Sequence, residues 1–127
     1  MLYQKELENR YTADFVVCGG GFSGFAAAVS AARAGLNTLL VEKTGCLGGT
    51  GTNCGVHHLL GAKHVNADYT LSKCVSGLFD ELESRLVQAG FAIDPYTIDQ
   101  HLNPHGWKKH LGEGLVFDAE GMKYVLE

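Results

Sequence analysis

The sequence predicts an α/β fold that begins with a parallel βαβ unit. Two short apolar runs rich in β-branched residues, 14–18 and 37–42, flank an alanine-rich helical segment at 23–34. Glycine is concentrated in the same region, because eleven of the 17 glycines lie between Gly19 and Gly61. A length of 127 residues suits one domain with a modest core, so we expect a single domain over residues 1–127.

Composition excludes several classes of protein. Hydrophobic residues make up 46% and charged residues 19%, which is typical of a globular chain. The net charge is −4 and no basic patch is present, which disfavours nucleic acid as a partner. Residues 15–32 carry no charge, but their four glycines argue against a membrane span or a signal peptide. With four cysteines and no export signal, we expect a cytoplasmic protein.

The first elements follow in order along the chain. Residues 1–12 are mixed and charged, and are expected to be a leader into the first strand. Residues 14–18 predict a buried strand that ends abruptly at glycine. The helix predicted at 23–34 is followed by Gly35, a common stop signal, and 37–42 predicts the second strand.

The next segment carries weaker signals. Residues 43–70 are rich in glycine without periodicity and predict a long loop region. Residues 71–89 place apolar side chains at helical spacing with charges between them, and Gly90 follows as a stop. A helix is therefore expected over 71–89.

The last segment predicts short elements. Residues 91–95 are expected to be extended, and 115–117 predict a short strand. Asp118 is a suitable N-cap for a helix that starts at about residue 119 and continues to the last residue, 127. Residues 96–114 show no pattern that predicts an element.

A GxGxxG motif at Gly19, Gly21 and Gly24 joins the first strand to the helix, and Glu42 follows 18 residues later at the end of the second strand. This context predicts a Rossmann-like dinucleotide-binding unit. Gly19 permits a tight turn, Gly21 admits a pyrophosphate, and Gly24 allows close packing of helix and strand. The helix N-terminus favours the phosphates, and Glu42 would accept hydrogen bonds from ribose hydroxyls.

Two alternatives accompany this interpretation. The motif could be a glycine turn that binds no ligand. If it binds a nucleotide, Glu42 disfavours NADP, because a 2′-phosphate would face a carboxylate.

A second glycine cluster follows Glu42, in the sequence Cys46-Leu47-Gly48-Gly49-Thr50-Gly51-Thr52. A unit that binds only NAD has no need of it, whereas a flavin running past the loop would. With residues 16–24 and 39–43, this segment resembles the FAD-dependent oxidoreductases of the glutathione-reductase-like type, which have two dinucleotide-binding folds. The similarity extends more loosely through 77–90 and 117–123.

The resemblance implies FAD as the cofactor, with its pyrophosphate at 19–24, its adenosine ribose at Glu42 and its ribityl and isoalloxazine side along 48–52. The expected cofactor contacts are Gly19, Gly21, Phe22, Ser23, Gly24, Glu42, Lys43, Gly48, Gly49 and Thr50. No residue is assigned a catalytic role.

The resemblance also implies a much longer chain. We therefore expect an incomplete FAD-binding domain, either the N-terminal part of such an enzyme or one chain of a split flavoprotein. The expected function is electron or hydride transfer at the flavin from a small organic substrate. The alternative is a non-catalytic dinucleotide-binding fragment or subunit that requires a partner chain. An open sheet edge would require a homo-oligomer or a second flavoprotein chain.

The cysteines and histidines give weaker indications. Cys46 and Cys54 are separated by seven residues, whereas flavin disulfide reductases have four between their redox cysteines, so a dithiol relay is disfavoured. Cys54 is the better candidate if either thiol reacts. The nearby histidines and cysteines match no zinc spacing, so no metal is expected. His57 or His58 could attach to the flavin or donate a proton near it. His101, His105 and His110 are expected on surface loops.

Overall fold

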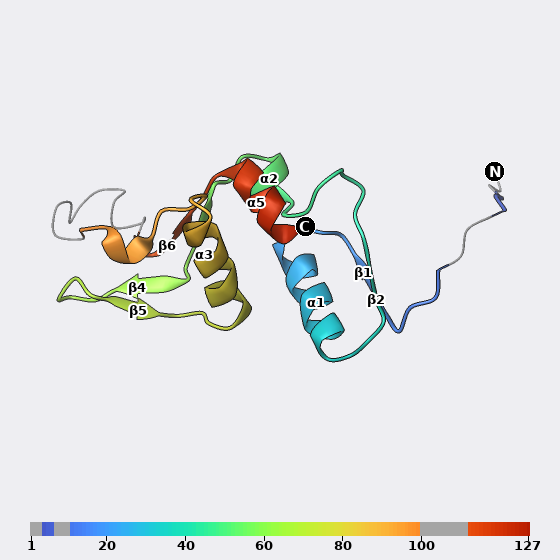
Figure 1. Cartoon of the computed structure of the whole chain (residues 1–127), viewed down its shortest axis with the longest axis horizontal. Coiled ribbons are helices and arrows are strands. Elements are labelled where there is room, and N and C mark those ends of the chain that lie inside the picture. Colours follow the sequence, from blue (N-terminus) through green and yellow to red (C-terminus); the bar gives the residue numbers. More distant parts are fainter. Residues whose placement is uncertain (1–3, 7–10, 100–111) are drawn as a thin grey trace.

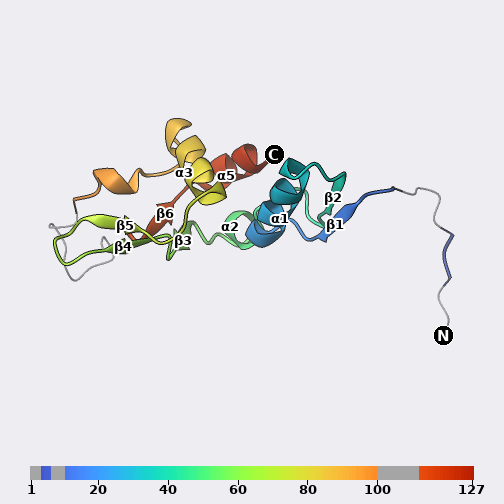
Figure 2. The ribbon, with the colours of Figure 1, turned by 90° about the horizontal axis from the view of Figure 1, so that it is seen from below.

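The computed structural model describes residues 4–6, 11–99 and 112–127. The molecule is elongated (Figures 1 and 2). A βαβ unit of β1, α1 and β2 lies at one end, and β4, β5 and α3 lie toward the other. Helices α2 and α5 lie between them and connect the two regions.

The predicted βαβ unit is confirmed. Strand β1 (Phe15–Cys18) pairs in parallel with β2 (Thr38–Val41), and Val17 lies opposite Leu40. Helix α1 (Phe22–Arg33) makes the crossover and ends before Gly35, whose φ is 87°. Its alanines let the helix lie close against the strands, because they add little side-chain bulk.

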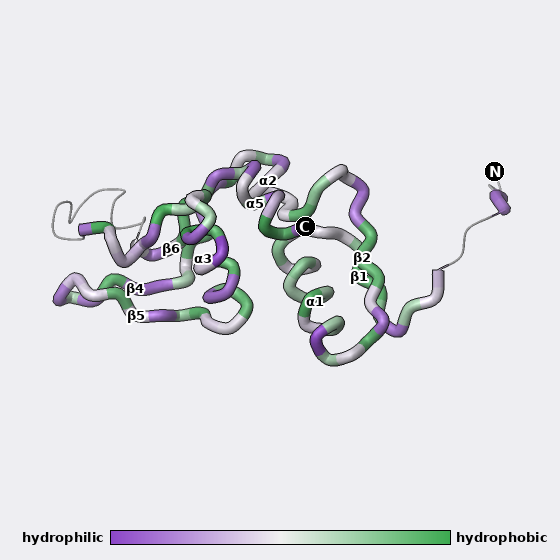
Figure 3. Tube along the Cα trace, in the orientation of Figure 1, coloured by the Kyte–Doolittle hydropathy of each residue, from purple (hydrophilic) through white to green (hydrophobic). Residues whose placement is uncertain are grey.

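This unit buries little of its own apolar surface. Among its described residues, Val17 and Ala31 are the buried hydrophobic ones. Val17 faces α1, so the alternation of a strand places Val16 and its cross-strand neighbour Leu39 on the opposite face. Val16 is 53% exposed, and Figure 3 shows that both strands are apolar. Within the described residues, the face of the β1–β2 pair away from α1 is therefore only partly covered.

The region 43–70, expected to be loop, contains three short elements. They are α2 (Thr50–Asn53), β3 (His58–Leu60) and β4 (Lys63–Val65). Periodicity cannot detect elements of three or four residues. The strands with which β3 and β4 pair also lie later in the chain. Gly61, with φ of 85°, makes the turn between β3 and β4.

The helix expected over 71–89 is shorter than predicted. Residues Leu71–Lys73 form β5, which pairs antiparallel with β4, and α3 spans Leu78–Gln88. Gly77 separates the two with φ of 72°, a conformation that glycine adopts without strain. Leu71 matches the helical period only by coincidence, because it pairs with Val65 across a strand.

The elements expected in the last segment are present. Strand β6 (Gly114–Val116) pairs antiparallel with β3, and Ile93 N donates to Val116 O at 3.0 Å from an extended segment. The short 3₁₀ helix η1 (Pro95–Thr97) follows the extended segment that contains Ile93. Helix α5 (Ala119–Leu126) begins after Asp118, whose carboxylate accepts a hydrogen bond from Gly121 N at 2.7 Å. The predicted N-cap is confirmed.

The main hydrophobic core lies between α3, β6 and α5. Its buried members are Leu82, Leu86, Leu115, Phe117, Met122 and Leu126. Phe22 and Phe25 of α1 pack against its edge, so the βαβ unit is attached to this core through one face of α1. No helix in the described part of the chain is long and apolar enough to cross a membrane.

Candidate dinucleotide-binding site

The glycine turn after β1 has the backbone geometry that its sequence predicts. Gly19 has φ of 107°, which strains any residue with a side chain. Its N–H donates to Val41 O at 2.8 Å, so the turn stays joined to the end of β2. The carboxyl ends of both parallel strands therefore meet at this turn.

Gly24 is required by packing. A Cβ at this position would lie 1.9 Å from Gly19 O and 3.3 Å from the Val17 side chain. Helix α1 thus rests directly on the turn and on β1, as expected for this position of the motif. No other residue type fits without moving backbone atoms.

Gly21 is different, because nothing in the protein fills the space beside it. A Cβ there would meet no atom within 4 Å, and its φ of −63° is one that any residue adopts. It is the N-cap of α1, and the first helical hydrogen bond runs from Phe25 N to Gly21 O at 2.8 Å. The N–H groups of the first turn precede that bond and point out of the helix end, where they favour an anion.

Glu42 follows β2 and turns its carboxylate toward the glycine turn. Oε2 accepts a hydrogen bond from Gly20 N at 2.5 Å, and Oε1 accepts from Thr44 N and Thr44 Oγ1, both at 2.8 Å. These bonds, first the one from Thr44 N–H and then that from Gly20 N–H, lower the pKa of the Glu42 carboxyl from 4.5 to about 2. Glu42 is therefore ionised at neutral pH.

The second glycine cluster lies against the first. Gly48 N donates to Gly20 O at 2.8 Å, and a Cβ on Gly49 would lie 3.0 Å from Gly21 Cα. Gly48 and Gly49 also have positive φ, of 98° and 56°. The sequence suggests that a flavin requires these glycines, but their positive φ and the protein atoms beside them, Gly21 Cα at Gly49 and the Thr52 side chain at Gly48, already favour glycine.

Gly51 and Phe22 have roles in packing. A Cβ on Gly51, in α2, would lie 2.4 Å from the Phe22 ring. That ring packs edge-on against Phe117, with centroids 6.2 Å apart. The Phe22 side chain is therefore committed to the interior, so only its backbone N–H is placed to face a phosphate.

The remaining predicted contacts, Ser23, Lys43 and Thr50, are all exposed. Ser23 is exposed on the first turn of α1, and Thr50 is exposed at the start of α2. Lys43 is also exposed, next to Glu42. Hydrogen bonds and close contacts thus join the glycine turn to Glu42, Gly48 and Gly49, where β1, β2 and α1 meet.

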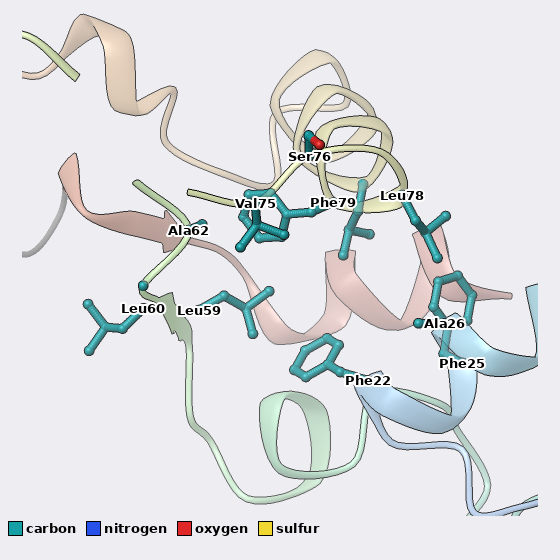
Figure 4. A pocket seen from close by; sticks show the side chains of 12 residues that line it. Phe22, Phe25, Ala26, Leu59, Leu60, Ala62, Val75, Ser76, Leu78 and Phe79 are labelled. Atoms are coloured by element: carbon teal, nitrogen blue, oxygen red, sulfur yellow. The ribbon is translucent and has the colours of Figure 1, made fainter. Parts of the chain in front are cut away.

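An apolar cavity lies on the other side of the α1 N-terminus. It has a volume of about 360 Å³ and is bounded by α1, β3 and the start of α3 (Figure 4). Phe22 and Phe25 point into it from α1, and Leu59 and Phe79 face them (Figure 4). Phe22 therefore separates this cavity from the glycine turn.

The cysteines and histidines do not form a recognisable centre. All four cysteines are free, Cys54 is exposed, and the Cys46 thiol donates to Asn53 Oδ1 at 3.1 Å. His57 is exposed, with its ring 6.3 Å from that of Phe117. Within residues 4–6, 11–99 and 112–127, no group of three potential ligands gathers for a metal ion. His101, His105 and His110 lie outside the described residues.

Sequence reasoning missed three residues at this site. Gly20 donates to Glu42 and is buried, while Thr44 and Asn53 bond to one another beside the carboxylate. The sequence signal for these contacts is Thr44, a hydroxyl residue two positions after Glu42. Asn53 gives no sequence signal, because its contact depends on how α2 folds back.

Comparison with known proteins relates this site to one family. A family model described as FAD dependent oxidoreductase matches residues 14–127. The chain is 37% identical to dihydrolipoyl dehydrogenase 2, mitochondrial, of Arabidopsis thaliana over 94 residues, which are 66% of this chain and 18% of that protein. It is 50% identical over 58 residues to dihydrolipoyl dehydrogenase of Trypanosoma brucei brucei, covering 43% of this chain and 12% of that protein.

A leghemoglobin reductase of Glycine max is 55% identical over 42 residues, which are 33% of this chain and 8% of that protein. The chain thus spans less than a fifth of the length of these relatives. No solved structure matches it.

Proposed function

The chain belongs to the FAD dependent oxidoreductase family, and we propose that it is the FAD-binding portion of a flavin-dependent oxidoreductase. The observation that carries the proposal is the open space at Gly21, between a turn that requires Gly19 and a contact that requires Gly24. FAD supplies the redox chemistry in this family, by accepting or releasing an electron pair at its ring.

The residues of this chain fit the adenosine diphosphate part of that cofactor. The first-turn N–H groups of α1, at Phe22, Ser23 and Gly24, would hold the pyrophosphate at the positive end of the helix. The ionised Glu42 would accept hydrogen bonds from ribose hydroxyls. Gly48, Gly49 and Thr50 follow the glycine turn and would lie along the ribityl chain. Lys43 would lie beside the adenosine.

The same geometry disfavours a nucleotide phosphorylated at the 2′ position. The Glu42 carboxylate is charged and held by three hydrogen bonds, so it cannot neutralise itself by taking up a proton at neutral pH. A 2′-phosphate would meet a fixed like charge. The site is therefore proposed for FAD and not for NADP.

The substrate is proposed only as a small organic electron donor. We do not propose a dihydrolipoyl substrate for this chain, because Cys46 and Cys54 are separated by seven residues and not by the four that lie between the redox cysteines of flavin disulfide reductases. The Cys46 thiol is bonded to Asn53.

We further propose that this βαβ unit is part of a Rossmann-like FAD-binding domain completed by other segments. The chain spans less than a fifth of the length of its relatives, and in the described residues the face of β1 and β2 that carries Val16 and Leu39 is only partly covered. A homo-oligomer, a second flavoprotein chain or further segments of a longer protein would cover it. Light scattering that shows a compact monomer at all concentrations would contradict association of this chain.

A second function is supported by the same exposed face. If the partner contributes the flavin ring environment, this chain alone is a dinucleotide-binding subunit without activity. Yellow colour in the purified chain favours the oxidoreductase, whereas binding of ADP without flavin favours the subunit.

We also propose that the protein is located in the cytoplasm.

The test of cofactor binding is Gly21→Val, measured by calorimetric titration with FAD. We expect at least about a tenfold loss of affinity, or 1.4 kcal/mol, because the branched side chain occupies the open space. Gly45→Val is the matched control: Gly45 also has open space at its Cβ and lacks positive φ, but it lies outside the glycine turn. Unchanged affinity in Gly21→Val would remove the structural basis of the proposal.

A further inference from the structure

Thr44 and Asn53 form a hydrogen-bonded network with the Glu42 carboxylate. Thr44 bonds Glu42 Oε1 through both its backbone N–H and its hydroxyl, each at 2.8 Å. Asn53 Nδ2 donates to Thr44 Oγ1 at 3.2 Å, and Asn53 Oδ1 accepts from the Cys46 thiol. The network joins the end of β2 to α2, the short helix that follows Gly48 and Gly49.

The network determines which way the Thr44 hydroxyl donates. A hydroxyl has one proton and two acceptor positions. Since Asn53 donates to Thr44 Oγ1, one acceptor position is filled, and the proton has two candidate acceptors, Glu42 Oε1 at 2.8 Å and Cys46 O at 3.0 Å. The carboxylate is the closer and the charged acceptor, so it takes the proton.

The same bonds leave one side of the carboxylate available. A carboxylate accepts about four hydrogen bonds, two at each oxygen. Thr44 fills both positions on Oε1, and Gly20 N donates to Oε2. A hydroxyl from a ligand is therefore directed to Oε2, next to the glycine turn.

We propose that Thr44 positions Glu42, that Asn53 positions Thr44, and that together they make the site selective for an adenosine ribose with free hydroxyls over one with a 2′-phosphate. This inference rests on the proposed function, because it assumes that Glu42 faces the ribose. Thr44 and Asn53 act through Glu42 and are positioning residues.

Selectivity depends on the charge being held in place. Without the Thr44 hydroxyl and its link to α2, the carboxylate keeps only its backbone donors and gains freedom to rotate toward water. A carboxylate that moves away repels a 2′-phosphate less and binds a ribose hydroxyl less well. Loss of the Thr44 hydroxyl should therefore reduce the ratio between the affinity for an adenosine ribose with free hydroxyls and the affinity for its 2′-phosphate.

The first experiment needs no ligand. The Glu42 carboxyl carbon is titrated by NMR in the wild-type chain, Thr44→Val and Thr44→Ser. Thr44→Val is expected to raise the pKa of Glu42, because one donor to the charged form is lost, and Thr44→Ser is expected to restore it. Thr38→Val is the matched control, since its hydroxyl bonds Leu36 O and lies away from Glu42. An identical titration in Thr44→Val would overturn the positioning role.

The second experiment measures selectivity with ADP-ribose and its 2′-phosphate by calorimetry. We expect Thr44→Val to reduce the wild-type ratio of affinities by about tenfold, the size of one hydrogen bond to a charged group. Asn53→Ala should reduce it less, because Asn53 acts through Thr44. Equal weakening of both ligands would indicate a structural role and contradict the proposal.

The two failures can be told apart. If the wild-type chain binds neither ADP-ribose nor FAD, the proposed function fails and the selectivity claim fails with it. The ligand-free titration still decides whether Thr44 holds Glu42, and Asn53→Ala in the same titration decides whether Asn53 acts through Thr44.

Discussion

The two regions of this molecule are stabilised in different ways. The βαβ unit of residues 15–41 buries only Val17 and Ala31 among its hydrophobic residues, and its order depends on backbone contacts around the glycine turn. The region from 58 to 126 contains the packed core, where Leu86, Leu115 and Met122 have no exposed surface. The glycine turn proposed to bind the cofactor lies in the first region, and the hydrophobic core that stabilises the fold lies in the second.

This difference shows what each region requires of its sequence. The glycine turn fixes residue types one by one, because an added Cβ at Gly24 meets backbone. The core requires apolar volume, which several residue types supply. The first region is therefore sensitive to changes at single glycines, and the second to the loss of buried volume or of a buried charge.

The largest expected effect is in the second region, at a buried ion pair. Lys63 of β4 has a side chain only 2% exposed, is paired with Glu83 of α3, and places its ammonium 5.3 Å from the Phe79 ring centroid. Lys63→Met leaves the Glu83 charge without its partner, so we expect a loss of about 3–5 kcal/mol in urea unfolding.

The double variant Lys63→Met with Glu83→Met tests the cause of that loss. Removing both charges should recover much of the stability, because an apolar pair needs no compensation in the interior. A single variant that loses less than about 1 kcal/mol would show that solvent reaches the pair.

The next effect is in the first region and compares two glycines of one motif. Gly24→Ala places a Cβ 1.9 Å from Gly19 O, so we expect at least the upper end of the roughly 1–3 kcal/mol that overpacking costs. The Cβ that Gly21→Ala adds meets no atom within 4 Å, so this variant should unfold at the same urea concentration as the wild-type protein. Equal destabilisation of the two variants would contradict the roles assigned to them.

The sequence predicted the first region better than the second for a physical reason. Gly19, Gly24 and Glu42 act through local backbone geometry at fixed spacing, so the motif contains the information. Strands β4 and β5 exist because they pair with one another, and three-residue strands carry no usable period. The helical spacing of Leu71 and Val75 therefore misled the prediction for 71–89.

The site itself was predicted in part. The glycine turn and Glu42 lie together as the motif indicates, whereas the Phe22 ring faces the interior because Gly51 and Phe117 form a surface for it. The link from Thr44 to Asn53 depends on α2 folding back against the end of β2. A contact of that kind is tertiary, and spacing along the chain does not reveal it.

A smaller effect is expected at the N-cap of α5, in the second region. The Asp118 carboxylate accepts a hydrogen bond from Gly121 N, so Asp118→Ala should cost about 1 kcal/mol of stability. Asp118→Asn keeps an acceptor at the same place and is expected to lose less. Thermal unfolding of the three proteins at neutral pH measures the difference, and an unchanged midpoint in Asp118→Ala would show that the cap is not needed.

The smallest effect concerns the pH dependence of the first region. Glu42 has a pKa of about 2 in the folded chain and 4.5 ordinarily, so the folded state binds fewer protons than the unfolded state between these values. Its contribution is complete above about pH 4.5 and is lost as pH falls toward 2. Glu42→Gln should therefore flatten the fall in melting temperature between pH 6 and pH 3.

Glu81→Gln is the matched comparison for that measurement. Glu81 also has a lowered pKa, caused first by its hydrogen bond from Arg33, and that ion pair joins α3 to α1 at 2.8 Å. Both variants should flatten the acid limb, but only Glu42→Gln should also weaken ADP-ribose binding at pH 7, because Glu81 lies on α3 and pairs with Arg33 in the last turn of α1, at the end of that helix opposite the glycine turn. If Glu42→Gln leaves the acid limb unchanged, the three hydrogen bonds to its carboxylate do not persist in solution.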